Sequence, residues 1–504
     1  MTLRTILIRA DASVEMGTGH VMRCLALSQA WQHAGGSVVF AMSESLPSVN
    51  ERLGFEGLPI VNLNCEVGSQ DDARETVGLA RSNHANWVVL DGYGFSAEYQ
   101  RRVKETGVKL LVVDDIGECS HYFADLVLNQ NVHGNEALYQ KREPYTRLLL
   151  GPRYVLLRRE FASLRERARE IPQIGHRVLI TMGGSDPENV TAKVVRAIRM
   201  VDVEGLQATV LVGGGNPHLT SLSALAAEDG AGIRIVTNPH SVAELMLWAD
   251  VAVSAAGSTC WEMCFLGLPA ILTSVAENQM PGAQELARRE IAVLLGSMNE
   301  LTPEKIAEEL QDVLLSPQRR ESMSQRGREL VDGRGCERVL TAMQSMELTM
   351  RHAGKSDCRL LWEWANDAGV RAASFQTEMI PWEEHAVWFA DKLDNALIYI
   401  AEDQQGKPVG QFRIDGLRDG DAQVDVSVAP EKRGCGIAAA LILKAVQTAF
   451  RETELVRLHA YVKPENRASL RAFEKAGFTV SETAGNVVHY SSERSRQLCG
   501  LAEG

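Results

Sequence analysis

The stretch GTGHVMRC, residues 17–24, places a histidine and an arginine directly after a pair of glycines. It follows the strand-like run TILIRAD and begins a helix-like run, so its amides point outward from a strand-to-helix turn. An imidazole is a side chain well suited to act as a base, so His20 is a candidate for that role, but a histidine at a helix start can also serve only to cap and pack. Arg23, one turn further, can meet a phosphate or a surface carboxylate.

A second turn of this kind lies in VSAAGSTCWEM, residues 253–263. Amides at a helix start can cradle a diphosphate, and a carboxylate one turn further can accept hydrogen bonds from ribose hydroxyls. The alternatives to a binding role are that the glycine only forms a tight turn and that the glutamate is only a solvated surface residue. The residues concerned are Gly257, Ser258, Thr259 and Glu262.

A third turn, TMGGSDPENVT, spans residues 181–191. Asp186 is expected to cap the following helix, with Pro187 as its first residue. Recurrence of such turns in two parts of the chain favours a ligand held between them.

Short apolar runs alternate with amphipathic runs over most of the first 330 residues, and the rhythm restarts after LLGPRYVLLRREF at 149–161. Strands alternating with helices predict a parallel sheet wrapped by helices. We therefore expect an α/β fold with two Rossmann-like halves, 1–160 and 161–350. Ligands of such sheets bind at the carboxyl ends of the strands, so the halves predict a nucleotide-sugar enzyme.

The pattern changes after the polar stretch RHAGKSD, residues 351–357, which we interpret as a linker. Two helical runs come first, then the strand-like meander ALIYIAED, GKPVGQFRID and DAQVDVSV, and then a helix, a strand and a final helix. This order predicts a separate α+β domain over 356–504.

Composition narrows the function classes. The 504 residues suggest two to four domains, and a net charge of −13 argues against a general nucleic-acid binder. Nine cysteines cannot all pair, so reduced thiols and a cytoplasmic location are expected. No uncharged run approaches the roughly 20 residues that span a bilayer, and RAD interrupts the N-terminal apolar run, so we expect neither membrane insertion nor a signal peptide.

Two pairs of residues are candidate metal ligands. Cys260 and Cys264 would share a helix face, and Asp114 and Asp115 are adjacent, but neither pair has the further ligands that zinc requires nearby in sequence. Loop capping is the preferred role for the aspartates, and no metal is expected.

A family resemblance rests on IRADASVEMGTGHVMRCLALSQAW, LDGYGF, VVDD, LLGPRYVLLRREF, TMGGSDPENVT and ADVAVSAAGSTCWEMCFLGLPAILTSVAENQ. In this order, over about residues 3 to 300, they resemble the UDP-sugar hydrolases of pseudaminic-acid biosynthesis, the PseG family. The resemblance implies a GT-B type frame and metal-independent hydrolysis with inversion at the anomeric carbon, in a pathway that supplies flagellin glycosylation.

The resemblance also implies roles for individual residues. His20 is the family's catalytic histidine, and Tyr93 and Asn278 match active-site positions that hold sugar and water. Asp11, at a strand end, is expected to hold or polarise His20, or else to cap the next turn. The expected substrate-binding residues are Gly17, Gly19, Arg23, Gly257, Ser258, Thr259 and Glu262.

The third block resembles the GCN5-related N-acetyltransferases (GNAT). VDVSVAPEKRGCGIAAALILKAV, residues 424–446, matches their R-x-x-G-x-G/A pattern, and LHAYVKPENRASLRAFEKAGF, residues 458–478, matches the second half of their motif. Amides of the turn would grip the pyrophosphate of acetyl-CoA, and Asn466 its pantetheine arm. The expected cofactor-binding residues are Val428, Arg433, Gly434, Gly436, Ala438 and Asn466.

One position departs from that family. Phe473 stands where many members have the tyrosine proposed to protonate the thiolate, and phenylalanine cannot donate a proton. Tyr461, another group or water would take this role, or the domain is slow or inactive. Asp425 and Glu402 are candidates for the base.

Together the resemblances imply a bifunctional enzyme. The third domain would acetylate UDP-4-amino-4,6-dideoxy-N-acetyl-β-L-altrosamine with acetyl-CoA, and the first two would release UDP and 2,4-diacetamido-2,4,6-trideoxy-L-altrose. The alternatives are a GT-B glycosyltransferase that uses a UDP-amino sugar, and a hydrolase with a non-catalytic acetyl-CoA-binding tail.

Overall fold

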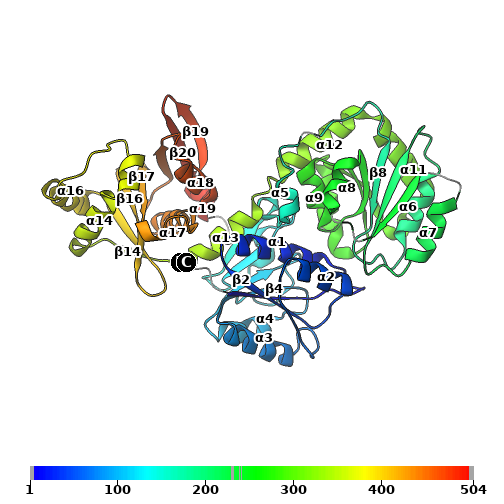
Figure 1. The fold of residues 1–504 in the computed structure, drawn as a ribbon, viewed down its shortest axis with the longest axis horizontal. Coiled ribbons are helices and arrows are strands. Elements are labelled where there is room, and N and C mark those ends of the chain that lie inside the picture. The colour runs from blue at the N-terminus through cyan, green and yellow to red at the C-terminus, as the bar shows by residue number, and fades with distance from the viewer. Residues whose placement is uncertain (1–4, 168, 229–231, 238, 240, 499–504) are drawn as a thin grey trace. The chain divides into compact units, whose positions relative to one another are not determined.

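The computed structural model describes residues 5–167, 169–228, 232–237, 239 and 241–498, and contains three β-sheets with their helices (Figure 1). The chain divides into two compact units, with the boundary between Cys336 and Glu337. The first unit holds two of the sheets and the second unit holds the third. Among the described residues, no helix is long and apolar enough to cross a membrane.

The first sheet is parallel and has the order β3-β2-β1-β4-β5-β6-β7. Figure 1 shows α3 and α4 on one face and α1 on the other. Its strands are β1 (Thr5–Ala10), β2 (Ser37–Met42), β3 (Ile60–Asn62), β4 (Ala85–Asp91), β5 (Lys109–Val113), β6 (Leu126–Asn129) and β7 (Arg147–Leu150). Its helices are α1 (Gly19–His33), α2 (Pro47–Phe55), α3 (Gln70–Ser82), α4 (Ala97–Lys104) and α5 (Arg159–Ala162).

The second sheet is also parallel, with the order β10-β9-β8-β11-β12-β13, and together the two sheets confirm the predicted pair of Rossmann-like halves. Its strands are β8 (Arg177–Thr181), β9 (Gln207–Val212), β10 (Ile233–Thr237), β11 (Val251–Ala255), β12 (Ala270–Ser274) and β13 (Ala292–Ser297). Its helices are α6 (Val190–Ile198), α7 (Leu219–Ala227), α8 (Val242–Trp248), α9 (Thr259–Leu266), α10 (Met280–Arg288), α11 (Pro303–Leu315) and α12 (Pro317–Leu330).

The helix expected to begin at Pro187 begins three residues later, at Val190. Asp186 has a positive φ of 47°, and its carboxylate accepts hydrogen bonds from the N–H groups of Val190 and Thr191. Asp186 therefore satisfies amides of the first turn, as predicted, but it does so from a loop that precedes the helix.

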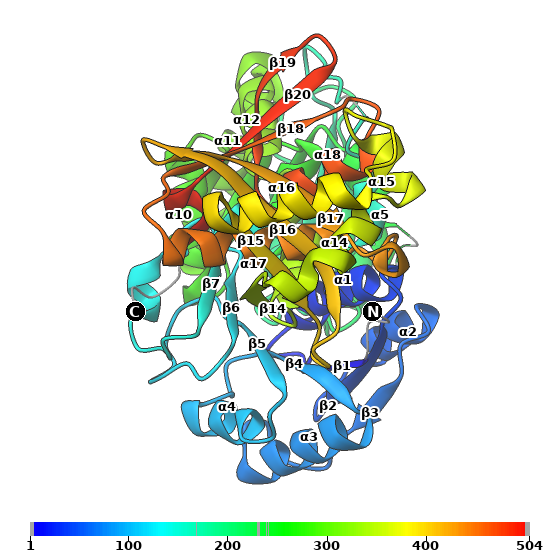
Figure 2. The same ribbon diagram turned by 90° about the vertical axis from the view of Figure 1, so that its left-hand side faces the viewer.

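The third sheet has the order β14-β15-β16-β17-β18-β20-β19 and is antiparallel except between β17 and β18 (Figure 2). Its strands are β14 (Thr349–His352), β15 (Leu397–Glu402), β16 (Pro408–Arg418), β17 (Asp421–Val428), β18 (Arg457–Val462), β19 (Thr479–Ala484) and β20 (Val487–Glu493). Helix α13 (Gly335–Ser345) spans the boundary between the units. The other helices of this unit are α14 (Cys358–Ala365), α15 (Ala368–Ala373), α16 (Trp382–Asn395), α17 (Ile437–Glu452), α18 (Arg467–Lys475) and α19 (Arg494–Leu498).

Successive apolar side chains of β15 point to opposite faces of the third sheet, which explains why helices cover both faces. Tyr399 and Ala401 lie in the core beside α17, whereas Ile398 and Ile400 pack with residues of α14 and α16. The expected linker at 351–357 was wrong, because β14 occupies part of it and pairs with β15. The polar sequence of this edge strand made it look like a linker.

A buried ion pair ties β1 to α3 in the first half. Arg9 and Asp72 are both fully buried, and Arg9 Nε donates to Asp72 Oδ1 at 2.8 Å. Asp72 also accepts hydrogen bonds from the Tyr99 hydroxyl and from the Gly68 amide. Although burial alone would raise the pKa of the Asp72 carboxyl, Arg9 and these donors hold that pKa below its usual value.

We predict that Asp72→Ala strongly destabilises the first unit, because it leaves the guanidinium of Arg9 with fewer partners in the core. Removing one partner of a buried pair costs about 3–5 kcal/mol, which corresponds to roughly 10 °C in Tm by calorimetry. Asp71→Ala is the matched control, since Asp71 is an exposed neighbour on α3, paired with Arg74, and should change Tm by about 1 °C or less. Equal shifts for both variants would contradict the assignment.

Candidate active site

A cleft of about 1070 Å³ opens between the two halves of the first unit. Its walls include the glycine turns that the sequence singled out, 17–19 from the first half and 183–184 and 257–259 from the second. The turns approach each other closely: a Cβ on Gly184 would lie 2.8 Å from Thr18 Oγ1, and one on Gly19 would lie 3.4 Å from Ser258 Oγ. Glycine at position 184 is therefore required by this close approach.

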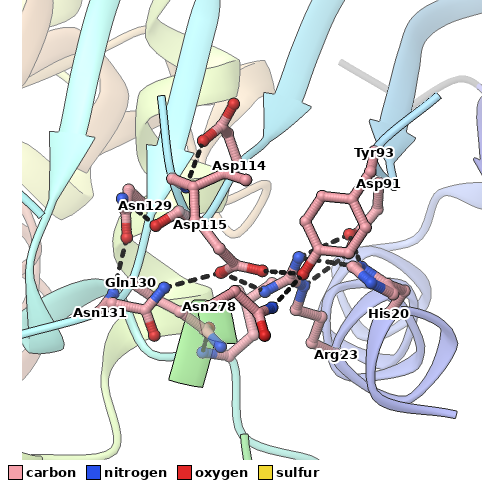
Figure 3. Close-up of polar contacts among 12 residues, drawn as sticks. His20, Arg23, Asp91, Tyr93, Asp114, Asp115, Asn129, Gln130, Asn131 and Asn278 are labelled. Atoms are coloured by element: carbon pink, nitrogen blue, oxygen red, sulfur yellow. Dashed lines mark hydrogen bonds and ion pairs between the residues drawn. The ribbon is translucent and has the colours of Figure 1, made fainter. Parts of the chain in front are cut away.

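His20 lies in the first turn of α1, lines the cleft and is 7% exposed (Figure 3). Its Nδ1 lies 2.6 Å from Asp91 Oδ1, at the end of β4. Because an ionised carboxylate only accepts, a neutral His20 ring that makes this bond has its proton on Nδ1 and its lone pair on Nε2. This is the tautomer that a general base requires.

Asp11 does not contact His20, contrary to our expectation. Its Oδ1 accepts hydrogen bonds from the N–H groups of Ser43 and Glu44, and its Oδ2 accepts from Arg9 at 2.6 Å. Asp11 therefore caps the turn after β2, and not the turn that directly follows Asp11, which was the alternative role. The carboxylate that orients His20 is Asp91, which the sequence analysis missed although it stands in the quoted motif LDGYGF.

Arg23 joins Asp91 to a second carboxylate. Its Nε and one terminal nitrogen donate to Asp91 at 2.7 and 2.6 Å, and the other terminal nitrogen donates to Asp115 at 2.8 Å (Figure 3). Although burial would raise the pKa of both carboxyls, the charge of Arg23 holds both values below their usual range. Of the two roles foreseen for Arg23, the structure gives it carboxylate partners inside the site.

Tyr93 and Asn278 meet across the cleft. Asn278 Nδ2 donates to the Tyr93 hydroxyl at 2.6 Å, and the Tyr93 ring stands edge-on to the imidazole of His20 with centroids 5.1 Å apart (Figure 3). Tyr93 comes from the loop after β4 and Asn278 from a short 3₁₀ helix, Glu277–Gln279, after β12, so the two are far apart in sequence. The structure therefore gathers three of the predicted catalytic residues, His20, Tyr93 and Asn278, in one place.

The second half supplies a helix start. Gly257 and Ser258 precede α9, whose first residue is Thr259, and all three line the cleft. Glu262 also lines it and accepts a hydrogen bond from Arg158 at 2.9 Å. Burial raises the pKa of the Glu262 carboxyl despite that cation. Arg158, from the segment that links the halves, is a further cleft residue that the sequence analysis did not single out.

Asp114 caps its own loop, as preferred from the sequence. Its Oδ1 accepts hydrogen bonds from the N–H groups of Ile116 and Gly117, and its Oδ2 accepts from the Tyr122 hydroxyl at 2.6 Å. Cys260 and Cys264 are buried in α9. In the described part of the chain, no three residues of His, Cys, Asp or Glu are grouped to hold a metal ion.

In the second unit, the turn that precedes α17 contains Gly434 and Gly436, each with a φ of 75°, a conformation that favours glycine. Arg433 Nε donates to the carbonyl oxygen of Val428 at 3.2 Å, and its terminal nitrogen pairs with Asp367. Ala438 lies in the first turn of α17. The turn thus presents amides at the start of a 16-residue helix, the feature on which the predicted anion site depends.

Asn466 and Phe473 both lie on α18 or at its start. The Asn466 side chain accepts a hydrogen bond from Ser469 N at 3.1 Å and so caps this helix. Phe473 is 3% exposed and packs against Phe478 and Tyr490. Phe473 is therefore a core residue here.

Two family models match the chain. The glycosyltransferase family 28 C-terminal domain matches residues 178–333, and the acetyltransferase (GNAT) domain matches residues 347–479.

Three relatives extend this result. An uncharacterized protein of Methanocaldococcus jannaschii is 24% identical, over 94% of this chain and 96% of its own. The spore coat polysaccharide biosynthesis protein SpsG of Bacillus subtilis is 26% identical, over 67% of this chain and 97% of its own. The UDP-2,4-diacetamido-2,4,6-trideoxy-β-L-altropyranose hydrolase of Campylobacter jejuni is 25% identical, over 56% of this chain and 96% of its own. The chain is therefore a fusion that joins a homologue of this hydrolase, with a glycosyltransferase family 28 C-terminal domain, to a C-terminal GNAT acetyltransferase domain.

Proposed function

We propose that the chain carries out two successive steps of pseudaminic-acid biosynthesis in the cytoplasm. The second unit acetylates the 4-amine of UDP-4-amino-4,6-dideoxy-N-acetyl-β-L-altrosamine, and the first unit hydrolyses the diacetamido product to UDP and the free sugar. The observation that carries the hydrolase assignment is the buried Asp91–His20 pair in a cleft faced by the start of α9. The homology to the Campylobacter jejuni hydrolase supports the choice of substrate.

In the proposed hydrolysis, water attacks the anomeric carbon while the bond from that carbon to the UDP oxygen breaks, with inversion. His20 Nε2 takes the proton of the water, and Asp91 stabilises the imidazolium that forms. Tyr93 and Asn278 hold the sugar and the water.

The leaving group needs stabilisation as well. Backbone amides at Ser258 and Thr259 and the positive end of α9 would stabilise the diphosphate, so we assign no step to a metal ion. Glu262 would accept hydrogen bonds from the ribose, with Arg158 holding the carboxylate in place.

In the proposed acetyl transfer, the turn from Arg433 to Ala438 holds the pyrophosphate of acetyl-CoA at the start of α17. β17 and β18 pair only over Asp421–Gln423 and Arg457–His459, while β17 continues to Val428 and β18 to Val462. The two strands therefore diverge toward this turn, and the arm of the cofactor fits between them. The match to the GNAT domain model supports this assignment.

A second candidate function is transfer of the sugar to an alcohol or lipid acceptor. The match to the glycosyltransferase family 28 C-terminal domain favours it. Release of UDP in the absence of any acceptor decides between the two, because only hydrolysis proceeds without one.

We predict that His20→Ala slows UDP release by roughly 10²- to 10⁴-fold, the usual contribution of a general base. A proton NMR time course with the UDP-4-amino sugar and acetyl-CoA would then stop at the diacetamido UDP-sugar. His33→Ala is the matched control, because His33 lies at the exposed end of the same helix. Undiminished UDP release by the His20 variant would refute the role of His20.

We predict that Asp91→Asn lowers kcat of hydrolysis by about 10²- to 10³-fold, because an amide cannot accept from His20 and from both nitrogens of Arg23 at once. Asp11→Asn is the comparison, since Asp11 contacts the turn after β2 and not His20. It should lower Tm more than kcat. A large loss of kcat for Asp11→Asn, with little loss for Asp91→Asn, would instead identify Asp11 as the partner of His20.

We predict that Arg433→Ala raises the KM for acetyl-CoA about tenfold or more, because the variant lacks the guanidinium that ties the pyrophosphate-binding turn to Val428 and Asp367. Hydrolysis of supplied diacetamido UDP-sugar should be unchanged. Lys432→Ala, at the neighbouring position and paired with Asp403, is the control. An unchanged KM together with normal acetylation would place the cofactor elsewhere.

A further inference from the structure

Of the proton-transfer candidates that the sequence pointed to, the carboxylates of Asp425 and Glu402 are engaged by other side chains, and Tyr461 remains a candidate for the acid. Phe473 has no proton to give. Asp425 accepts a hydrogen bond from Gln411 at 3.0 Å. Glu402 forms an ion pair with Arg351 at 2.7 Å on the β14–β15 side of the sheet. Asp425 lies on β17 beside the opening between β17 and β18, and further titratable side chains lie at the closed end of that opening.

The closed end of that opening is fixed by the strand register. The last pair that joins the two strands is Gln423 with His459, and beyond it, among the described residues, β17 pairs with β16 and β18 pairs with β20. Val428 is the fifth residue after Gln423, and five steps at strand rise span roughly 17 Å. With its pyrophosphate at the Arg433 turn, an extended cofactor arm would bring its thioester toward the closed end, beside His459.

A chain of titratable side chains begins at this closed end. Asp421 Oδ2 lies 3.2 Å from His459 Nε2, and His459 Nδ1 lies 2.9 Å from His489 Nε2. The ring of Tyr461 stacks on that of His489, with centroids 4.7 Å apart and an angle of 10° between the rings. The three elements that contribute are β17, β18 and β20, which are adjacent in the sheet.

The cluster faces away from α17. Leu458, Ala460 and Val462 of β18 lie in the core that includes α17, so the alternate residues His459 and Tyr461 point to the opposite face. His459 is 20% exposed and Asp421 is 46% exposed, so the cluster is open to a substrate that approaches from this face.

The hydrogen bonds allow one consistent protonation pattern with two neutral histidines. The carboxylate of Asp421 accepts, so His459 Nε2 donates and His459 Nδ1 accepts. His489 Nε2 therefore donates, which leaves the lone pair on His489 Nδ1. Burial and the neighbouring His459 lower the pKa of His489, which keeps this lone pair available near neutral pH.

We propose that His489, connected through His459 to Asp421, is the base that deprotonates the amine during acetyl transfer. The inference rests on the proposed acetyltransferase activity. The amine nitrogen forms a bond to the acetyl carbon, and the bond from that carbon to sulfur breaks. The proton of the amine passes to His489 Nδ1 and then, through solvent, to the thiolate of CoA. Asp421 stabilises the charge that the two imidazoles share.

The first test measures acetylation of the UDP-4-amino sugar by the full chain, with the release of the CoA thiol as the readout. His489→Ala should lower kcat about 10²-fold, with the affinity for acetyl-CoA unchanged by calorimetry, and added imidazole should restore part of the rate. Asp421→Asn should lower kcat about tenfold. His352→Ala is the control, because His352 lies on β14 of the same sheet and pairs with Glu452. A normal kcat for His489→Ala, or a loss that imidazole does not relieve, would overturn the inference.

The second test needs no acceptor sugar and separates the inference from the proposed function. Histidine ring resonances of the ¹⁵N-labelled chain, assigned with the His459 and His489 variants, are recorded with and without acetyl-CoA. Shifts at His459 and His489 support the placement of the thioester beside them. Binding of acetyl-CoA without such shifts refutes the inference alone, whereas failure of acetyl-CoA to bind refutes the proposed function of this unit and the inference with it.

Discussion

The carboxylate of Asp91 is the constraint on which the proposed hydrolytic site depends. It is fully buried at the end of β4, where an unpaired charge would cost several kcal/mol. Arg23 and His20 share it, and both come from the first turns of α1. The same contacts that make this charge tolerable in the core also fix the tautomer of His20. The residues that stabilise the buried charge of Asp91 are therefore also the residues that the proposed chemistry requires.

The two halves of the first unit contribute different physical properties to the cleft. The first half provides the titratable groups, in the chain Asp115–Arg23–Asp91–His20. The second half provides backbone amides at the start of α9, which stabilise negative charge without a side-chain cation. Close contact between Gly184 and Thr18 brings these parts together. This arrangement suits the proposed hydrolysis, in which the two walls would stabilise the attacking water and the departing diphosphate.

Much of this arrangement was predictable, and the failures have physical causes. The alternation of apolar runs predicted both parallel sheets, and the glycine turns indicated the cleft walls, because both signals are local. The partner of His20 was not predictable, since Asp11 and Asp91 both follow buried strands and only the strand order decides which one α1 approaches. In the second unit, strand pairing likewise determines which distant side chains meet. His459 and His489 lie 30 residues apart and come together because β18 pairs with β20. The edge strand β14 was missed because its residues are polar.

The two units are unrelated in fold, yet anion binding is proposed in both at the start of a helix that follows a strand. In each case a glycine precedes a helix start that has no side-chain cap, and such a start suits the diphosphate of a nucleotide substrate. The proposed proton-transfer groups lie elsewhere, on the first turn of α1 in the first unit and on β18 and β20 in the second, as imidazoles backed by a carboxylate. This separation has a mechanistic consequence. The groups that bind the common phosphate portion of UDP or CoA can stay fixed, while the residues that contact the reacting atom determine whether water or an amine reacts.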